Sequence, residues 1–188
     1  MAQRVRLLFL RGGIMNEVRT LPLTQGKVAL VDAADYEWLN QWKWMTRKSE
    51  NTFYAIRRVR HPRGSQSHIR LHRVILNAPA GVEIDHRNHN GLDNRRCNIR
   101  LCSHGENGQN SKKQDGPTTS VYKGVYWQKA AHKWHAQIGY DRKLIYLGLF
   151  AYEADAALAY NAAASRLHGE FARLNIIQDA RCSRVQES

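Results

Sequence analysis

The segment that decides the fold reads Val82-Glu-Ile-Asp-His-Arg-Asn-His-Asn-Gly-Leu-Asp-Asn-Arg-Arg-Cys-Asn-Ile-Arg-Leu-Cys-Ser-His-Gly-Glu-Asn107. Residues 82–84 predict a short apolar strand, and a polar loop rich in Asn and Gly, as tight turns require, follows. Residues 98–101 predict a second short strand. Ser103-x-x-Glu106 has the spacing of a capping box, which indicates that a helix begins there. The segment therefore predicts the order strand, loop, strand, helix.

Four side chains in this segment fit metal-assisted hydrolysis of a phosphodiester. A hard divalent cation takes oxygen ligands, and Asp85 and the amide oxygen of Asn107 can supply two of them. His86 points away from Asp85 if the strand continues through both residues, and a neutral imidazole is a suitable general base near neutral pH. Asn98 can accept the other imidazole N–H and so fix the tautomer. Activated water would then attack while the metal stabilises the departing oxygen.

The whole spaced string resembles the HNH (ββα-metal) endonucleases, in the branch common among phage and intron-encoded homing enzymes. The matching positions are Ile84-Asp85-His86, Asn88-x-Asn90-Gly91-x-Asp93-Asn94-Arg95, Asn98-Ile99-Arg100 and Glu106-Asn107-x-x-Asn110. The resemblance implies that Asp85 and Asn107 hold the metal, that His86 is the general base, and that Asn98 orients it. Asn107 stands where the family often has His, which disfavours zinc because zinc prefers nitrogen and sulfur ligands. We expect Mg²⁺, with Mn²⁺ as a substitute, and no organic cofactor.

The charge of the chain points to a polyanionic partner. The 188 residues carry a formal net charge of +13, which disfavours an acidic small-molecule enzyme and favours nucleic acid or an anionic membrane as the partner. No apolar run approaches the length of a membrane span. The three cysteines include no C-x-x-C pair, so neither a disulfide framework nor a cysteine zinc site is indicated, and a reducing compartment fits.

The basic residues are concentrated in residues 43–73, where nine basic side chains accompany a single acidic one. A hairpin is predicted there from residues 53–60 and 68–71, turning at residues 62–64. Upstream, residues 27–31 predict a strand and residues 35–44 a short helix. We expect phosphate contacts from the hairpin, the alternative being a solvated outer face. The predicted DNA-contacting residues of this half are Arg57, Arg58, Arg60, Arg70, His72, Arg73 and Arg100. For His72 a packed core position is an equal alternative, and for Arg100 an ion pair is.

A second pattern follows a polar stretch that holds Gly116 and Pro117. Residues 122–127, 133–138 and 143–147 predict three strands, with Gly124 marking a bulge. Residues 153–168 predict an alanine-rich helix, and Gly169 is placed as its C-terminal cap. The predicted core residues are Leu147, Phe150, Leu158 and Leu174.

This stretch resembles the Apetala-two / ethylene-response-factor DNA-binding domain. The matching pieces are Tyr122-Lys-Gly-Val125, Lys133-Trp134, Leu147-Gly-x-Phe150, Glu153-Ala154 with Ala159-Tyr160, and Gly169-x-Phe-Ala-x-Leu-Asn175. The resemblance implies a three-stranded sheet in the major groove. Several positions that are usually Arg or Trp are Lys, Tyr or Gln here. The corresponding DNA-contacting positions are Lys123, Trp127, Lys129, Trp134, Gln137, Arg142, Lys143 and Tyr146. For Trp134 and Tyr146, packing within the hairpin is the alternative.

The sequence thus predicts an α+β protein with an N-terminal ββα-metal HNH module and a C-terminal three-stranded antiparallel sheet packed on one helix. The expected boundaries are a leader (1–18), the nuclease domain (19–112), a linker (113–120), the DNA-binding domain (121–175) and a tail (176–188). Residues 1–14 are also interpreted as a dispensable leader before an alternative start at Met15. The predicted function is site-specific cleavage of double-stranded DNA by a cytoplasmic homing-type endonuclease, acting as a monomer or homodimer in a bacterial or phage-infected cell. The alternatives are a DNA-binding regulator with a non-functional nuclease module and an RNA-binding protein.

Overall fold

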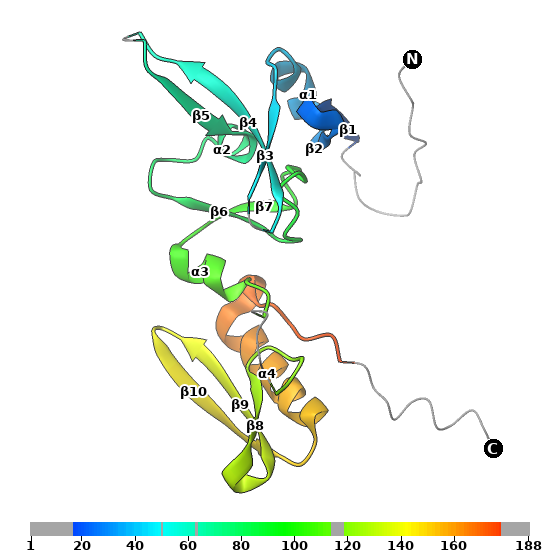
Figure 1. The fold of residues 1–188 in the computed structure, drawn as a ribbon, viewed down its shortest axis with the longest axis vertical. Helices are drawn as coiled ribbons and strands as arrows, with labels where there is room; N and C mark the ends of the chain where they lie inside the picture. The colour runs from blue at the N-terminus through cyan, green and yellow to red at the C-terminus, as the bar shows by residue number, and fades with distance from the viewer. Residues whose placement is uncertain (1–16, 50, 63, 114–118, 178–188) are drawn as a thin grey trace, which may run out of the picture. The chain divides into compact units, whose positions relative to one another are not determined.

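A computed structural model describes residues 17–49, 51–62, 64–113 and 119–177 (Figure 1). The predicted leader up to residue 16, most of the predicted linker and the predicted tail from residue 178 lie outside these ranges, as does Arg63 of the predicted turn. The chain forms two compact units. The first unit comprises the described residues up to Asn77 together with Asn88–Arg100. The second comprises Ala78–Arg87 and the described residues from Leu101 onward.

The first unit begins with a hairpin and a short helix. Strand β1 (Val18–Pro22) pairs antiparallel with β2 (Val28–Asp32) around a 3-10 turn, Thr24–Gly26, and α1 (Ala33–Asn40) follows. The expected strand at residues 27–31 is confirmed with a shift of one residue. The helix expected at residues 35–44 ends at Asn40, because Trp44 adopts an extended conformation beside Leu23 and is buried there.

A three-stranded antiparallel sheet carries most of the basic residues of this unit. Its strands are β3 (Met45–Lys48), β4 (Phe53–Arg60) and β5 (Gln66–Arg70) in the order β3-β4-β5, and α2 (Leu71–Ile75) follows directly. The predicted hairpin is confirmed, and the first of its two strands has the predicted bounds. The core of the unit is formed by apolar side chains from the strands and helices, including Leu21, Val31, Leu39, Ile56 and Leu71.

The predicted order strand, loop, strand, helix is confirmed in the segment that opened the sequence analysis. Strands β6 (Glu83–His86) and β7 (Ile99–Cys102) form a two-stranded sheet, and α3 (His104–Gln109) follows. The capping box is present. The Ser103 hydroxyl accepts the Glu106 amide N–H at 3.3 Å, and Glu106 Oε2 accepts the Ser103 N–H at 2.8 Å. This reciprocal pair satisfies backbone donors at the start of a helix of only six residues.

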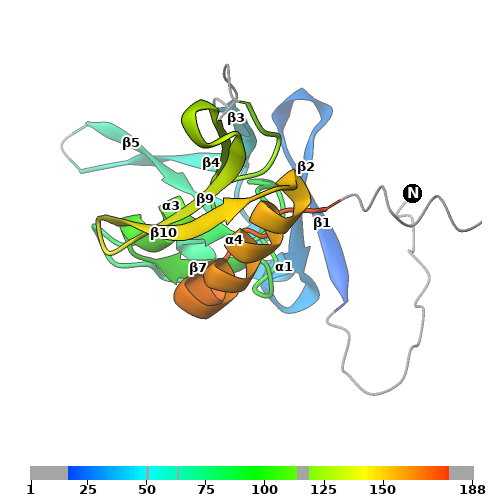
Figure 2. The same cartoon turned by 90° about the horizontal axis from the view of Figure 1, so that it is seen from below.

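The C-terminal part of the second unit is a three-stranded antiparallel sheet with one long helix against it (Figure 2). The strands are β8 (Val125–Gln128), β9 (Lys133–Tyr140) and β10 (Lys143–Phe150), in the order β10-β9-β8. Helix α4 (Glu153–His168) has the predicted bounds, Gly169 is its C-terminal cap, and a 3-10 turn (Gly169–Phe171) ends it. The buried residues between helix and sheet include Val125, Ala136, Ile138 and five residues of the helix, Ala156, Ala157, Tyr160, Ala163 and Ala164.

Two core predictions in this part are wrong. Leu158 is 54% exposed and Leu174 is 47% exposed. The buried face of α4 follows Ala156, Tyr160 and Ala163 at the helical spacing of four and three residues, which places Leu158 on the outer side. Leu147 and Phe150 do pack against the buried clusters, as predicted.

The predicted bulge at Gly124 is also wrong, because the irregular register lies between Tyr146 and Gly148 of β10. Gly124 precedes β8 and has a φ of +75°. A Cβ at this position would lie 2.2 Å from the Tyr160 ring and 2.5 Å from the Gln137 carbonyl oxygen. The glycine is therefore required both by its left-handed backbone and by the close approach of the helix.

The two units together make a mixed α+β protein of several small antiparallel sheets and few helices. Within the described residues, no helix is both long and apolar enough to cross a membrane.

Candidate functional site

Strand β6 and helix α3 present two carboxylates to two amides. Glu83 and Asp85 share one side of the strand because they are two residues apart, and Asn107 and Asn110 share one side of the helix end because they are three apart. Asp85 is buried, and Asn110 Nδ2 donates to both of its carboxylate oxygens at 2.9 and 3.0 Å. Asn107 Nδ2 donates to Glu83 Oε2 at 2.7 Å. We call these four residues the β6–α3 polar ladder.

Glu83, which accepts from Asn107 in the polar ladder, also contacts a histidine. His104 Nδ1 lies 2.8 Å from Glu83 Oε1, although the His104 side chain is 95% exposed. The hydrogen bond from Asn107, followed by the hydrogen bond and charge of His104, holds the pKa of Glu83 below its ordinary value. Glu83 therefore stays ionised beside the buried Asp85, and the ladder presents two carboxylates to its amides.

The polar ladder differs from the predicted ligand pair in its partners. Asp85 and Asn107 were expected to share a metal, but their hydrogen bonds are to Asn110 and Glu83 respectively. Glu83 and Asn110 were not predicted as site residues. Their spacing could have identified them, since Glu83 is two residues before Asp85 on a strand and Asn110 is three residues after Asn107 on a helix.

The four side chains of the polar ladder can offer a metal ion the oxygen atoms of two carboxylates and two amides. The exposed His104 at the edge of the ladder adds a ring nitrogen. This donor chemistry fits a hard cation such as Mg²⁺ and is unsuited to zinc. Among the described residues, no group of three or more His, Cys, Asp and Glu is arranged to hold a metal ion. The residues present would therefore have to bind a metal through amide oxygens and water in addition to carboxylates.

His86 and Asn98, the predicted base and its orienting partner, are both buried but lie in different units. His86 is part of β6, so strand alternation directs it away from Asp85, as expected. In the first unit, the side-chain oxygen of Asn98 accepts the backbone N–H of Asn88 at 3.1 Å, and its Nδ2 donates to the Asp93 carbonyl at 2.7 Å. Asn98 is thus fixed by its own loop, and its predicted bond to His86 stays a prediction.

The loop that precedes Asn98 is held by short-range side-chain hydrogen bonds. Asn88 Oδ1 accepts the backbone N–H of Asn90 at 2.9 Å, and Asn90 Oδ1 accepts that of Leu92 at 3.1 Å. These are Asx turns, in agreement with the interpretation of the loop asparagines as turn-formers. The loop is also tied to β2, because the Asn94 backbone N–H donates to the Leu30 carbonyl at 2.8 Å.

Asp93 is the most heavily bonded side chain of this loop. It is 1% exposed and accepts hydrogen bonds from Asn88 Nδ2 at 2.8 Å and from the Arg95 guanidinium at 2.7 and 2.6 Å. Burial acts to raise the pKa of Asp93, but the hydrogen bonds and charge of Arg95 outweigh it, so the pKa lies below its ordinary value. The pKa of Arg95 is raised by the same contact. Asp93 and Arg95 therefore form an ionised pair, and this pair holds the loop in place.

Three of the predicted DNA-contacting arginines lie together on the basic hairpin. Arg58 and Arg60 are two residues apart on β4, so their side chains share one face of the hairpin. Arg70 of β5 lies opposite Ile56, which is on the same face of β4, so Arg70 belongs to that face too. All three are exposed. Arg57 points to the other face, where its guanidinium lies 4.4 Å from the centre of the Trp42 ring. The hairpin therefore presents a compact cationic face of three arginines.

The remaining predicted contacts of the first unit are less accessible. His72 is buried with its ring 5.6 Å from that of Tyr54, which fits the alternative of a packed histidine. Arg73 is half-buried, and Arg100 is 9% exposed. Their proposed contacts with DNA are not supported by this burial.

The C-terminal sheet has one face against α4 and one open face. His135 stacks on Tyr126 with ring centres 4.4 Å apart and lies 4.9 Å from the Tyr146 ring, and these side chains belong to the open face. Trp127 and Trp134, 5.2 Å apart, belong to the other side, and Trp134 packs against the buried cluster. Packing within the hairpin, the alternative for Trp134, is therefore what the structure has, whereas Tyr146 is 60% exposed.

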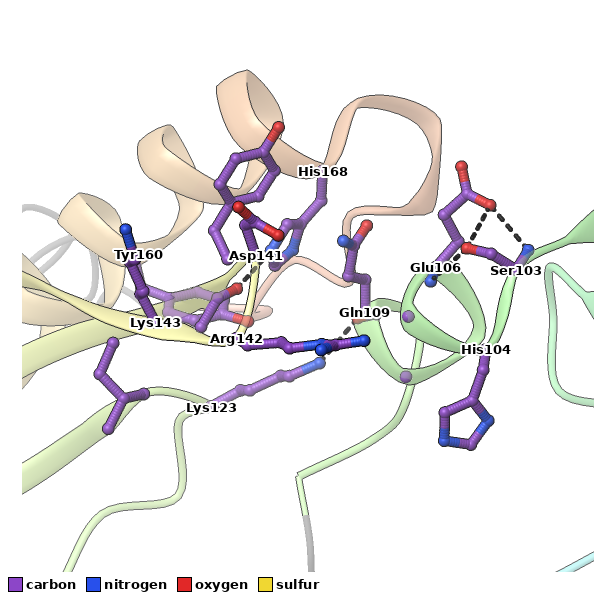
Figure 3. A pocket seen from close by; sticks show the side chains of 15 residues that line it. Ser103, His104, Glu106, Gln109, Lys123, Asp141, Arg142, Lys143, Tyr160 and His168 are labelled. Atoms are coloured by element: carbon purple, nitrogen blue, oxygen red, sulfur yellow. Dashed lines mark hydrogen bonds between the residues drawn. The ribbon is translucent and has the colours of Figure 1, made fainter.

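Lys123, another predicted DNA contact, is occupied by the chain itself. Its ammonium group donates to the carbonyl oxygen of Gln109, the last residue of α3, at 2.8 Å (Figure 3). It also donates to the carbonyl oxygen of Ser111 at 2.7 Å. Burial, with a smaller contribution from Arg173, lowers the pKa of Lys123 to about 8. This lysine borders a cavity of about 880 Å³, which is lined by residues of α3, α4 and the turn between β9 and β10. At that turn Arg142 and Lys143 are exposed, as is Lys129 at the far end of the sheet.

The comparisons with known proteins concern a part of the chain. No protein-family model and no solved structure matches it. It is 39% identical over 69 residues to the Ethylene-responsive transcription factor ERF024 of Arabidopsis thaliana, which corresponds to 36% of this chain. The chain covers 38% of the length of that relative. The similarity agrees with the resemblance stated for the C-terminal module, and it does not bear on the HNH resemblance.

Proposed function

We propose that this chain is a DNA-binding protein whose C-terminal sheet docks on duplex DNA. The observation that carries the proposal is the similarity to a transcription factor. Three further features support it: an open sheet face that carries aromatic and amide side chains, an exposed arginine face on the β4–β5 hairpin, and the net charge of +13. Phosphate contacts from such cations supply affinity without sequence preference, and side chains in a groove supply the preference.

A second function, cleavage of the bound DNA by a metal-dependent homing-type endonuclease, is favoured by the polar ladder. A carboxylate and a histidine are both buried on consecutive residues of β6, and a helix end places two amides beside the carboxylates. Burying polar groups costs free energy unless they are hydrogen-bonded, and Asn110 supplies such bonds to Asp85. The alternative within the same proposal is a DNA-binding regulator whose nuclease module is non-functional, and the similarity to a transcription factor favours that alternative over cleavage.

If the polar ladder is part of a nuclease active site, its residues and His86 would have separate roles. Asp85 and Asn107, joined by Asn110 and Glu83, would hold a divalent cation such as Mg²⁺ or Mn²⁺, which supplies positive charge at the departing oxygen. His86, on the opposite side of the strand, would accept a proton from water at an imidazole nitrogen. The carboxylate–amide bonds of the ladder would keep Asp85 in place.

Duplex binding is tested by competition in a gel-shift assay with the full chain and no divalent metal. A labelled DNA duplex should be displaced by unlabelled duplex DNA and much less by duplex RNA of the same sequence. The double variant Arg58→Ala/Arg60→Ala should weaken binding and flatten its salt dependence, because two phosphate contacts are removed. Equal displacement by RNA would favour the RNA-binding alternative, and the absence of any duplex binding would refute the proposal.

Cleavage is tested on supercoiled plasmid with Mg²⁺ or Mn²⁺. If the ladder is an active site, the wild type nicks the plasmid, His86→Ala does not, and both bind DNA equally. His61→Ala is a matched control, because His61 is exposed and lies at the tip of the basic hairpin. Tight DNA binding without nicking by the wild type would leave the regulator as the function.

A further inference from the structure

The open face of the C-terminal sheet has a defined layout that follows from its register. Tyr126 of β8, His135 of β9 and Leu149 of β10 form one row across the strands. Gln137 and Tyr146 form the next row, and Gly139 and Leu144 the one after. Since alternate residues of a strand point to the same side, these rows share the face opposite α4.

The centre of this face carries no charge. Tyr126 and Tyr146 offer hydroxyl groups, Gln137 offers an amide, and Leu144, which is 71% exposed, offers an apolar contact. Lys133 is the one charged side chain that the described strands place on the face, and it lies in the end row opposite Gln128. The ring of His135 stacks on that of Tyr126 and lies tilted against that of Tyr146, so the three rings contact one another at the centre of the face.

Cations lie at both ends of the face. Lys129 and Lys133 are exposed where β8 turns into β9, and Arg142 is exposed beside Asp141 where β9 turns into β10. The register places Lys143 opposite Tyr140, on the side of α4. Asp141 and Arg142 of this second turn both have positive φ, at 49° and 58°, as a tight two-residue hairpin turn requires. An uncharged centre with a cationic side chain at each end matches a duplex groove, where phosphates flank the edges of the bases.

The chemistry of the centre decides which bases it can recognise. Guanine is read in the major groove by the paired donors of Arg or Lys, whereas Gln makes a two-bond contact with adenine and an apolar side chain contacts the thymine methyl group. The described centre offers the second set, with Gln137 beside Tyr146 and one row from Leu144. We propose that the open face of β8–β10 selects A·T base pairs in the major groove, with Gln137 as the residue that reads adenine. This inference rests on the proposed binding of duplex DNA by the sheet.

The test is selection of binding sites from a random duplex pool by the full chain, with a chelator present so that bound DNA stays intact. The wild type should enrich a site with at least one strongly preferred adenine. Replacing that A·T pair by G·C should weaken binding by at least about fivefold. Gln137→Arg should convert the preferred adenine to guanine, because the new side chain supplies two donors. Gln137→Ala should remove the preference at that position while the others remain.

Ser165→Arg is the matched control for the added charge. Ser165 is exposed on α4, away from the open face. This substitution should therefore strengthen binding to all duplexes to a similar extent without altering the base preference. A selected site rich in G·C pairs, or one that Gln137→Arg leaves unchanged, would overturn the inference while duplex binding stands. Failure to enrich any duplex at any salt concentration would instead overturn the proposed function on which the inference rests.

Discussion

The motif segment, residues 83–110, and the C-terminal module, residues 122–175, are stabilised in opposite ways. The motif segment depends on side-chain hydrogen bonds, with Asp85 joined to Asn110 and Asp93 joined to Arg95. The C-terminal module depends on apolar contact between a sheet and a helix whose buried face is largely alanine. The small side chains allow α4 to approach the sheet closely, and Gly124 leaves room for the ring of Tyr160, the large side chain of that face.

This difference separates two tasks. Buried polar groups add little net stability, but they fix side chains in one arrangement, which is what a site that positions water or a cation needs. A well-packed sheet and helix form a rigid base and leave the opposite face free for contacts. The motif segment should therefore respond to pH and to loss of single polar groups, and the C-terminal module should respond to changes of volume.

The largest effect is expected from Gly124→Ala in the C-terminal module. The new Cβ would lie 2.2 Å from the Tyr160 ring, and the left-handed backbone at φ +75° adds strain. We expect a loss of about 3 kcal/mol or more, since overpacking and backbone strain each cost about 1–3 kcal/mol. The measurement is chemical unfolding, with hydrogen exchange of β9 to assign the loss to this module.

Gly108→Ala is the matched control for that substitution. Gly108 lies in α3, and a Cβ there would meet nothing within 4 Å. Alanine should stabilise the helix by about 0.5–1 kcal/mol, so the two substitutions are expected to have opposite signs. Equal destabilisation by both would contradict the steric explanation.

The next effect concerns Asp93 in the motif segment and depends on pH. Because the folded pKa of Asp93 lies below its ordinary value, its carboxylate stabilises the fold above that ordinary value. The contribution is lost as the pH falls through the folded pKa. Asp93→Asn should cost about 2 kcal/mol at pH 7, since Arg95 loses a charged partner in a buried position.

The measurement is hydrogen exchange of residues 88–98 at pH 7 and at pH 3. The difference between Asp93→Asn and wild type should be smaller at the lower pH, which lies below the ordinary pKa of the carboxyl group, because the unfolded wild-type chain then takes up a proton there. Asp141→Asn, which removes the same charge from an exposed turn, should change stability by less than about 0.5 kcal/mol at either pH. A difference between Asp93→Asn and wild type that is constant with pH would argue against the ionised pair as its cause.

A loss of comparable size is expected from breaking the polar ladder itself. Asp85→Ala leaves the buried amide of Asn110 without its two carboxylate bonds, which should cost about 1–3 kcal/mol. The double variant Asp85→Ala/Asn110→Ala should lose less than the sum of the two single losses, because the unpaired amide is removed as well. Additive losses, measured by urea unfolding, would show that the two side chains do not act as a pair.

The sequence predicted the elements of both regions, since each follows from a local pattern. The helix at Glu153–His168 follows from its alanine spacing and its C-terminal glycine, and α3 follows from its capping box. The choice of partner across elements is a tertiary property that local patterns do not contain. Asn107 is hydrogen-bonded to Glu83, a partner that becomes visible only once strand and helix are side by side, and its predicted role as a metal ligand with Asp85 stays a prediction.

The same limit explains the misplaced leucines and the occupied lysine. Leu158 and Leu174 are apolar and were assigned to the core, but the burial of Leu158 depends on which face of α4 meets the sheet, and Leu174 lies beyond the end of α4. Lys123 matches a DNA-contacting position of the resembling family, yet its ammonium group is bonded to two carbonyl oxygens next to α3. Residue type predicted the chemistry in these cases, and the contacts of the folded chain determined where it is used.

The smallest effect is expected from Ser103→Ala, which removes the side-chain half of the capping box of α3. Loss of an N-cap hydroxyl costs about 1 kcal/mol, and α3 has only six residues, so few other helical bonds can compensate. Hydrogen exchange of residues 104–110 should become faster while β9 and α4 keep their protection, because their apolar packing does not involve the cap. Ser103→Asp, which retains an accepting oxygen, should restore most of the protection. If Ser103→Ala leaves the exchange of α3 unchanged, the capping box does not hold this helix, and the Asp85–Asn110 and Glu83–Asn107 bonds do. The polar ladder would then stabilise the helix as well as form a site.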